Sequence, residues 1–270
     1  MTTDGHGRNI DYLRISVTDR CNYRCVYCMP EDGIRLKGHD EILTFEEIVR
    51  IADAAGELGF RKLRLTGGEP LVRRNIERLV GMISNTGYYN DISMTTNGTM
   101  LSPILALTLR DMGLDRINIS LDTLDSERFA EITRGGDIDE VFDGIEAAKR
   151  AGFDPVKINM IIFDTTTLEE VESMRTFCGE HGLLLQTIKH FSLYRMVDSG
   201  QVHSFDRPMP CSRCDRLRLT ADGYLKPCLF SNNEIKVDMD DIKGSILKSV
   251  GEKPLEGSSC CNRSMYQIGG

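Results

Sequence analysis

Three cysteines near the beginning of the chain have the spacing of ligands for an iron–sulfur cluster. Cys21, Cys25 and Cys28 share one short loop that follows a segment of alternating apolar and polar residues. Three thiolates can bind three irons of a cubane [4Fe–4S] cluster and leave its fourth iron open to a small molecule. A zinc site usually has four ligands in paired Cys-x2-Cys elements, and no nearby His or Cys completes such a set here. The spacing therefore favours a cluster whose open iron implies chemistry.

A second group of three cysteines lies in the last quarter of the chain. Cys211 and Cys214 form a Cys-x2-Cys pair, and Cys228 follows a segment that reads as a β-hairpin with an Asp-Gly turn. Such a hairpin would return Cys228 to the first two cysteines. On spacing alone a zinc ribbon stays open, because three other residues could supply a fourth ligand: Cys260, Cys261 and His203. Alongside the first group, a second [4Fe–4S] cluster is favoured.

The elements that must position these cysteines alternate between strand-like and helix-like segments, as expected of βα units with parallel strands. The expected strands cover 12–18, 62–67, 91–97, 116–122, 155–163 and 183–191. The expected helices cover 44–58, 74–86, 102–112, 126–133, 138–151 and 167–181, and several begin at capping residues such as Thr44 and Ser102. Six such units predict an α/β fold: an incomplete (β/α)6 TIM-type barrel over 1–192, followed by a small C-terminal iron–sulfur extension over 193–270.

The strands also divide into an apolar and a polar face, because their side chains alternate with a period of two. Outer helices can cover only the apolar faces, so the polar faces should line an open, cationic interior. An antiparallel sheet with one face in solvent would give the same alternation, and the intervening helices make that reading weaker. Six cations stand on the expected polar faces: Arg14, Lys62, Arg64, Lys157, Arg216 and Arg218.

Composition limits the classes of protein to which this chain can belong. With 40% hydrophobic and 27% charged residues, the chain is typical of a folded globular protein. A formal net charge of -8 argues against a general nucleic-acid binder, so an anionic ligand must meet locally clustered cations. No export signal and no run of about 18 apolar residues occurs, so we expect no membrane span and a cytoplasmic location. Nine cysteines in such a chain indicate metal ligands and free thiols more than disulfides.

The cysteine spacing, with Tyr27 before the last cysteine, closely resembles the signature of the radical S-adenosylmethionine (SAM) superfamily. There the open iron chelates SAM, and an electron from the cluster cleaves it to a 5′-deoxyadenosyl radical. The resemblance implies that Gly68 and Glu69, in a Gly-Gly-Glu-Pro segment, contact the amino group of SAM. It also implies cofactor-binding roles for four further residues: Tyr27, Thr95, Asn97 and Ser120.

Longer segments narrow the resemblance to the molybdenum cofactor biosynthesis protein A family, the GTP 3′,8-cyclases. The similar segments are 14–30, 62–74, 211–223, 226–230 and 265–270. The resemblance implies a lyase that uses two [4Fe–4S] clusters and SAM to convert GTP to (8S)-3′,8-cyclo-7,8-dihydroguanosine 5′-triphosphate, the first step of molybdopterin synthesis. In that family the radical removes the ribose 3′ hydrogen, and the C-terminal cluster binds the guanine at its open iron.

The family resemblance also implies roles for individual residues and partners. The six cations correspond to family positions near the triphosphate or the nucleoside, which fits a substrate with about four negative charges. The implied catalytic residues are Arg216, Arg218 and the C-terminal pair Gly269 and Gly270. We further expect a low-potential, flavodoxin- or ferredoxin-like electron donor, and we allow for a homodimer.

The chain departs from the family pattern in two places that bear on the substrate. Only about twenty residues separate Phe191 from Cys211, where the family has several dozen more. Gln186 occupies a position where the family has an arginine, and an uncompensated loss of that charge would cost about 1.5–3 kcal/mol. Nearby cations that could substitute are Lys189, His190 and Arg195. Cys260 and Cys261 are not part of the family pattern, and either thiolate could complete the second cluster.

Two alternatives remain at this stage. One is a related radical SAM maturase that modifies a peptide or another nucleotide and uses its C-terminal cluster as a substrate anchor or electron relay. The other is a non-catalytic iron–sulfur or zinc protein, which predicts no SAM binding and no loss of function when Glu69 is replaced.

Overall fold

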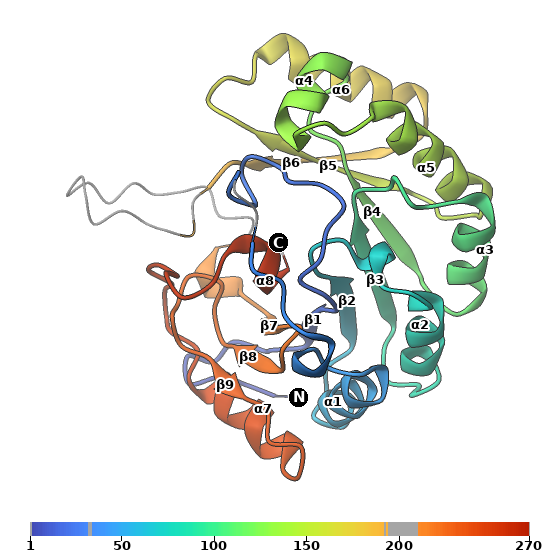
Figure 1. The fold of residues 1–270 in the computed structure, drawn as a ribbon. Coiled ribbons are helices and arrows are strands. Elements are labelled where there is room, and N and C mark those ends of the chain that lie inside the picture. Colours follow the sequence, from blue (N-terminus) through green and yellow to red (C-terminus); the bar gives the residue numbers. More distant parts are fainter. Residues whose placement is uncertain (1, 32–33, 192, 194–209, 270) are drawn as a thin grey trace.

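The computed structural model describes residues 2–31, 34–191, 193 and 210–269, and its centre is one curved sheet (Figure 1). The strand order is β6-β5-β4-β3-β2-β1-β7-β8-β9. Neighbouring strands from β6 to β7 are parallel, and β7, β8 and β9 pair antiparallel. The strands are β1 Tyr12–Ser16, β2 Lys62–Thr66, β3 Asp91–Thr96, β4 Arg116–Ser120, β5 Lys157–Ile162, β6 Leu184–Lys189, β7 Arg216–Leu219, β8 Tyr224–Lys226 and β9 Ile235–Lys236.

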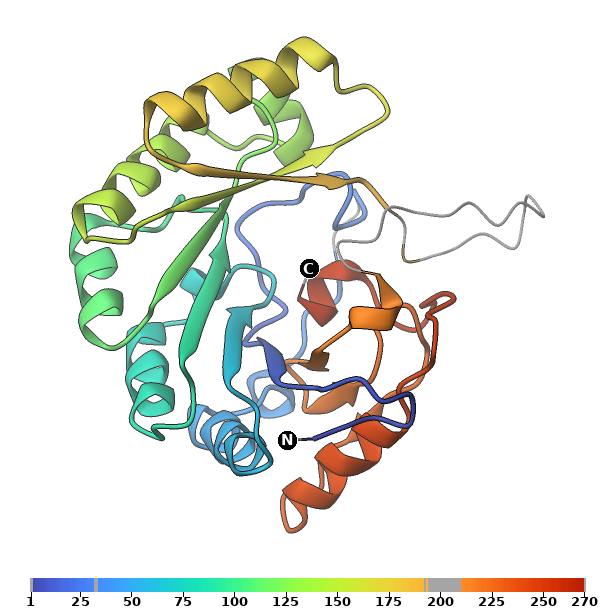
Figure 2. The same ribbon diagram turned by 180° about the vertical axis from the view of Figure 1, so that it is seen from behind.

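Helices cover the outer, convex side of this sheet (Figures 1 and 2). They are α1 Phe45–Glu57, α2 Ile76–Ser84, α3 Pro103–Asp111, α4 Ser126–Thr133, α5 Ile138–Arg150, α6 Leu168–Glu180 and α7 Ile242–Gly251, whereas the short α8 Met265–Ile268 lies inside the curve. Short 3-10 turns span His39–Glu41, Pro70–Val72 and Cys211–Arg213. Thr44 begins α1 with a reciprocal capping box to Glu47, and the Ser102 hydroxyl accepts a hydrogen bond from the Leu105 amide at the start of α3. Both caps satisfy amides that the first helical turn leaves without partners.

The hydrophobic core lies between the sheet and these helices. Leu13 and Ile15 of β1 and Leu63 and Leu65 of β2 are fully buried there, together with Ile51 of α1. At about 25 cal/mol for each square ångström of apolar surface, one such side chain contributes roughly 1.5–3 kcal/mol. The apolar faces of the strands therefore anchor the sheet to its helices and leave the polar faces towards the interior.

The predicted alternation of strands and helices is confirmed. Each of the six expected strands and six expected helices is present, with ends that differ by no more than a few residues. The expected incomplete barrel is also confirmed, as is the hairpin between β7 and β8, where Gly223 has a φ of 81°. Beyond the expectation, β7 pairs directly with β1, so the C-terminal region continues the same sheet. The predicted domain boundary after residue 192 stays a prediction.

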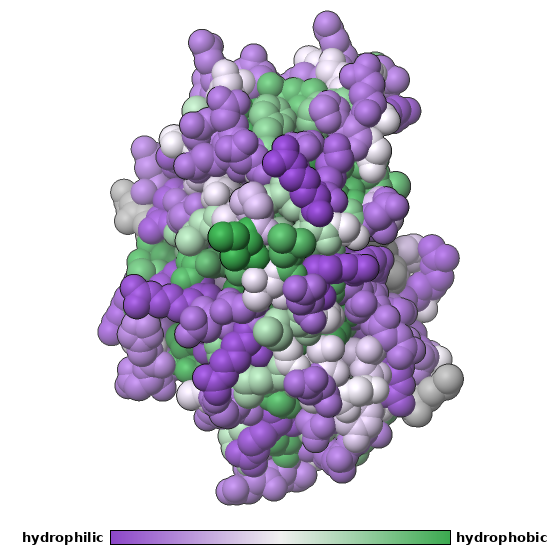
Figure 3. All heavy atoms as spheres, turned by 90° about the vertical axis from the view of Figure 1, so that its right-hand side faces the viewer, coloured by the Kyte–Doolittle hydropathy of each residue, from purple (hydrophilic) through white to green (hydrophobic). Residues whose placement is uncertain are grey.

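The C-terminal end of the chain lies inside the curve of the sheet, where α8 is located (Figures 1 and 2). The outer face is largely hydrophilic with a hydrophobic area near its middle (Figure 3). Exposed apolar side chains on α3, which belongs to this side of the molecule, include Ile104 and Leu107. In the described part of the chain, no helix combines the length and the apolar character needed to cross a membrane.

Candidate active site

The loop with Cys21, Cys25 and Cys28 follows β1 and lines an interior cavity. All three thiols are free and partly buried. The Cys28 amide donates to the Cys25 carbonyl at 2.9 Å, and the guanidinium of Arg134 donates to the carbonyls of Arg24 and Met29. These bonds hold the loop as a tight turn at the carboxyl end of β1, which is where βα barrels carry their sites.

The environment of the three thiols fits a cluster. Burial raises the pKa of Cys21 to about 11 and that of Cys25 to about 12, and burial also raises the pKa of Cys28. Such thiols stay protonated near neutrality unless a bound cation stabilises the thiolates. Among the described residues, no group of three or more His, Cys, Asp or Glu side chains has the arrangement that holds a metal ion. The three thiols share one loop, which can present one thiolate to each of three separate irons of a cubane.

Glu69 and its glycine neighbour stand beside the cysteine loop. A Cβ on Gly68 would lie 2.2 Å from the carbonyl oxygen of Arg20, so only glycine allows this approach of the two backbones. Glu69 is 1% exposed and accepts hydrogen bonds from the Thr96 hydroxyl at 2.6 Å and the Asn97 amide at 2.7 Å. Burial raises the pKa of Glu69 to about 7, and these bonds partly oppose that rise. All six residues expected to bind SAM line the cavity of the three cysteines: Tyr27, Gly68, Glu69, Thr95, Asn97 and Ser120.

A row of arginines crosses the polar face of the sheet within the same cavity. Arg14 of β1 lies in register with Arg64 of β2 on one side and Arg218 of β7 on the other. These three and Arg216 line the cavity. Burial, together with the neighbouring charge of Arg216, lowers the pKa of Arg218 to about 10. Several guanidinium groups gathered in a largely buried place require anionic charge, and a polyphosphate would provide it.

Two of the predicted cations are not among the residues that line the cavity. Lys62 begins β2 and reaches Asp11 at 3.4 Å and Asp215 at 3.8 Å, so its charge is paired near the amino ends of the strands. Lys157 begins β5, where burial lowers its pKa and the charges of Arg64 and Arg116 lower it further. Their roles towards a ligand stay predictions.

The C-terminal tail enters the cavity from the open side of the barrel. Arg218 donates a hydrogen bond of 2.8 Å to the carbonyl oxygen of Gly269. Gly269 has a φ of 73°, and a Cβ there would lie 2.0 Å from the hydroxyl of Thr66. Glycine is therefore required both by backbone conformation and by space. Gly270, the second residue of the predicted pair, lies outside the described residues.

Buried ion pairs anchor this tail to the end of the sheet. The guanidinium of Arg263 is 8% exposed and binds Asp222 at 2.8 Å and Glu234 at 2.9 Å. Asp222 also pairs with Lys37, which follows the cysteine loop, and Glu234 also approaches Lys226. The tail, the hairpin and the segment after the cysteine loop thus meet in one ionic cluster.

The second cysteine group surrounds the β7–β8 hairpin as expected. Cys211, Cys214 and Cys228 are all partly buried, and burial raises the pKa of Cys228. They are not among the residues lining the cavity, although Leu229 next to Cys228 is. Of the fourth-ligand candidates, Cys260 is fully buried, with its thiol 3.2 Å from the amide oxygen of Asn262. Cys261 is exposed, and His203 lies outside the described residues.

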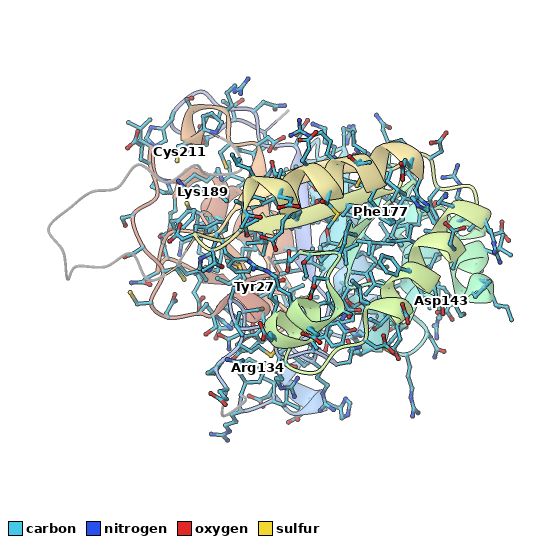
Figure 4. All side chains as sticks on the ribbon, turned by 90° about the horizontal axis from the view of Figure 1, so that it is seen from above. Tyr27, Arg134, Asp143, Phe177, Lys189 and Cys211 are labelled. Atoms are coloured by element: carbon cyan, nitrogen blue, oxygen red, sulfur yellow. The ribbon has the colours of Figure 1, made fainter. Side chains whose placement is uncertain are left out.

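The cavity wall contains Gln186, which replaces an arginine of the family pattern, and two of the cations that could compensate for the lost charge. Gln186, Lys189 and His190 all line it, whereas Arg195 lies outside the described residues. His190 packs against Phe163, whose ring in turn lies 5.7 Å from that of Tyr27. In Figure 4, Tyr27 and Lys189 lie on the side of the molecule towards Cys211, whereas Asp143 lies on the opposite side, on the outer helix α5.

Several residues of the site were missed in the sequence. Asp122 and Asn159 line the cavity; the alternation of side chains puts both on polar strand faces, but no site role was assigned to either from the sequence. Burial raises the pKa of Asp122 to about 6, while the Tyr27 hydroxyl donates a hydrogen bond to its carboxyl group. Lys253 and Arg263 follow no periodic pattern, so nothing in the sequence indicated that they are buried near the site.

Comparisons with known proteins agree with this geometry. Residues 15–178 match the family model described as "Radical SAM superfamily". The GTP 3′,8-cyclase of Peptoclostridium acidaminophilum is 38% identical over 318 aligned positions, covering 99% of this chain and 98% of that protein. The GTP 3′,8-cyclase of Thermodesulfovibrio yellowstonii is 37% identical over 321 positions, with 99% of each chain covered. Both alignments exceed the 270 residues of this chain, so these relatives carry residues that it lacks.

Solved structures share the fold. SuiB from Streptococcus suis superposes with a TM-score of 0.68 at 15% identity, covering 93% of this chain and 68% of that chain. The protein anSMEcpe, solved with bound AdoMet, gives a TM-score of 0.62 at 16% identity, covering 90% of this chain and 81% of the other. At such identities the likeness concerns the fold alone. The family match and the near full-length relatives establish that the chain belongs to the radical SAM superfamily and, within it, to the GTP 3′,8-cyclase family.

Proposed function

We propose that this protein is a GTP 3′,8-cyclase, a lyase that forms the cyclic dihydroguanosine triphosphate in the first step of molybdenum cofactor biosynthesis. One observation supports this function most strongly. The three-cysteine loop and the arginine row of β1, β2 and β7 face one cavity, into which the C-terminal tail also reaches. A radical site and a polyanion site are thereby close enough to act on one molecule.

The superfamily membership gives this chain a [4Fe–4S] cluster and SAM. Cys21, Cys25 and Cys28 would hold the cluster, and when bound with SAM it supplies one-electron chemistry that yields a carbon radical. Glu69 would accept a hydrogen bond from the amino group of SAM, and Thr95, Asn97, Ser120 and Tyr27 would line the remainder of its site. The buried cavity wall would exclude water from the radical.

The cationic side of the cavity would hold GTP. Arg14, Arg64 and Arg218 would bind phosphate oxygens by charge-assisted hydrogen bonds, which are roughly twice as strong as neutral ones. Arg216 and Arg218 would also act at the reaction centre, and Gly269 would fix the position of Arg218 through its carbonyl oxygen. Substrate-binding roles for Lys62 and Lys157 also belong to the proposal, although neither lines the cavity.

A second [4Fe–4S] cluster on Cys211, Cys214 and Cys228 belongs to this proposal, with the guanine of GTP as its external ligand. A low-potential flavodoxin- or ferredoxin-like protein would supply electrons in the cytoplasm, and a homodimer remains part of the expectation. Iron analysis after anaerobic reconstitution tests the second cluster. We expect about eight irons per chain, falling to about four in a Cys211→Ala variant. Four irons in both proteins would refute the second cluster.

Anaerobic incubation with SAM, dithionite and GTP tests the activity. We expect 5′-deoxyadenosine and a cyclised GTP product in matching amounts. SAM cleavage without GTP consumption would reject the cyclase and favour a maturase that acts on a peptide or another nucleotide. An Arg218→Met variant should lose cyclisation. Its matched control is Arg116→Met, because Arg116 pairs with Asp91 and does not line the cavity.

A further inference from the structure

A buried lysine contacts the second cysteine group from outside its sequence motif. Lys253 follows α7, nearly forty residues after Cys214, and is only 3% exposed. Its ammonium donates to the carbonyl oxygen of Arg216 at 2.6 Å and to that of Pro227 at 2.7 Å, and it lies 3.7 Å from the sulfur of Cys214. A lysine ammonium has three donors, and these three contacts account for all of them.

Within the described residues, the charge of this ammonium has no carboxylate in an ion pair with it. Another buried cation beside this group, Arg8, donates to the Cys211 carbonyl at 2.8 Å and is paired with Asp4 at 2.6 Å. A buried ammonium without a counter-charge destabilises the folded chain, so a negative charge is needed beside it. The cysteine sulfurs are the groups that can provide one.

We propose that Lys253 is a positioning residue of the second cysteine group and supplies the fixed positive charge that balances its thiolate-bound centre. This inference rests on the second cluster of the proposed function. A cubane with three thiolates carries net negative charge, and that charge grows on reduction. A nearby ammonium therefore stabilises the reduced form more than the oxidised form and raises the reduction potential. Through the Arg216 and Pro227 carbonyls, Lys253 also fixes the strand and the turn that bring the cysteines together.

The test uses the full-length chain with Cys21, Cys25 and Cys28 replaced by alanine, so that only the second centre remains. After anaerobic reconstitution, the midpoint potential is measured by EPR-monitored titration, and the loss of iron to a chelator is followed. We expect Lys253→Met to lower the potential and to lose iron about 10–100-fold faster, as is typical when a partner of a metal ligand is removed. Lys253→Arg, which keeps the charge, should restore both values towards those of the parent.

Lys226 provides a matched control on the same hairpin. It is fully buried, but it donates to the Ser231 carbonyl and lies 3.7 Å from Glu234, so its charge is paired. Lys226→Met should lower thermal stability and shift the potential less than Lys253→Met. An unchanged potential and iron loss in Lys253→Met, or an equal shift in Lys226→Met, would overturn the proposal. Should Lys253→Met not fold, Lys253→Gln, which keeps two donors without the charge, is judged by the same criteria.

Failure of this inference can be separated from failure of the cyclase. If the triple-alanine chain binds zinc or no metal while the otherwise unaltered chain still cyclises GTP, the role of Lys253 is refuted and the cyclase stands. If the unaltered chain cleaves SAM and leaves GTP intact, the cyclase fails, and the potential measured for Lys253→Met still decides the role of the lysine.

Discussion

Replacing Arg263 by methionine tests whether the buried ion pairs hold the C-terminal tail in the cavity. The guanidinium binds Asp222 at 2.8 and 3.1 Å and Glu234 at 2.9 and 3.0 Å while only 8% exposed. Removing one partner of a buried pair costs about 3–5 kcal/mol. Because Asp222 keeps Lys37 and Glu234 keeps Lys226, we expect the lower value, about 3 kcal/mol. That corresponds to a rise of about 100-fold in the population of the detached tail.

Hydrogen exchange read by mass spectrometry measures this population directly. Amides of residues 264–269 should exchange about 100-fold faster in Arg263→Met, while those of β2 and β3 stay protected. Radical formation should persist, so we expect 5′-deoxyadenosine to accumulate with less cyclised product. The control is Arg78→Met, because Arg78 and Glu46 form an exposed pair that contributes at most about 1 kcal/mol. Equal tail exchange in Arg263→Met and the unaltered protein would refute the anchoring role.

The remaining predictions concern pH, space and helix stability. Burial raises the pKa of Glu69 from 4.5 to about 7. Between pH 4.5 and 7 the folded protein therefore holds a proton that the unfolded chain has released, and the free energy of unfolding should fall as the pH rises through this range. Because the amino group of SAM would need the carboxylate, SAM affinity in equilibrium dialysis should fall about tenfold per pH unit below 7, and Glu69→Gln should remove this dependence. Gly68→Ala should displace the cysteine loop, because its Cβ meets the Arg20 carbonyl, and iron analysis should then show loss of the first cluster; a normal iron content would contradict this. Thr44→Ala should cost about 1 kcal/mol, seen as a fall of about 2–4 °C in Tm with cyclisation unchanged, because it removes only the cap of α1; an unchanged Tm would mean that the cap adds nothing.

The features that the sequence predicted well are those that depend on local patterns. The alternation of apolar and polar residues predicted β1 and β2, and capping residues such as Thr44 predicted where helices begin. Both patterns depend on residues only a few positions apart. Alternation indicates which face a residue takes but not its height along the strand. For that reason Arg14 was correctly expected in the cavity, whereas Lys62, at the start of its strand, pairs with Asp11 near the amino ends.

Long-range pairings could not be predicted in the same way. The contact of β7 with β1 joins residues about two hundred positions apart and leaves no periodic trace. Lys253 and Arg263 are single buried cations whose partners come from other segments, so their surroundings exist only in the folded chain. The family resemblance assigned Glu69 to the SAM site. Its hydrogen bonds to Thr96 and Asn97 could not be predicted, because these residues reach it only once the end of β3 is folded beside it.

The pairing of β7 with β1 has a consequence for biosynthesis on the ribosome. Until residues 216–219 have been synthesised, one edge of β1 has unpaired backbone N–H and C=O groups. Such an edge can pair with strands of other chains. Contacts of such high sequence separation also form slowly. Because the arginine row needs β7 for its third member, a nascent chain could shape its cysteine loop well before it can bind a triphosphate. Translation itself would thus delay substrate capture until the radical-forming half is in place.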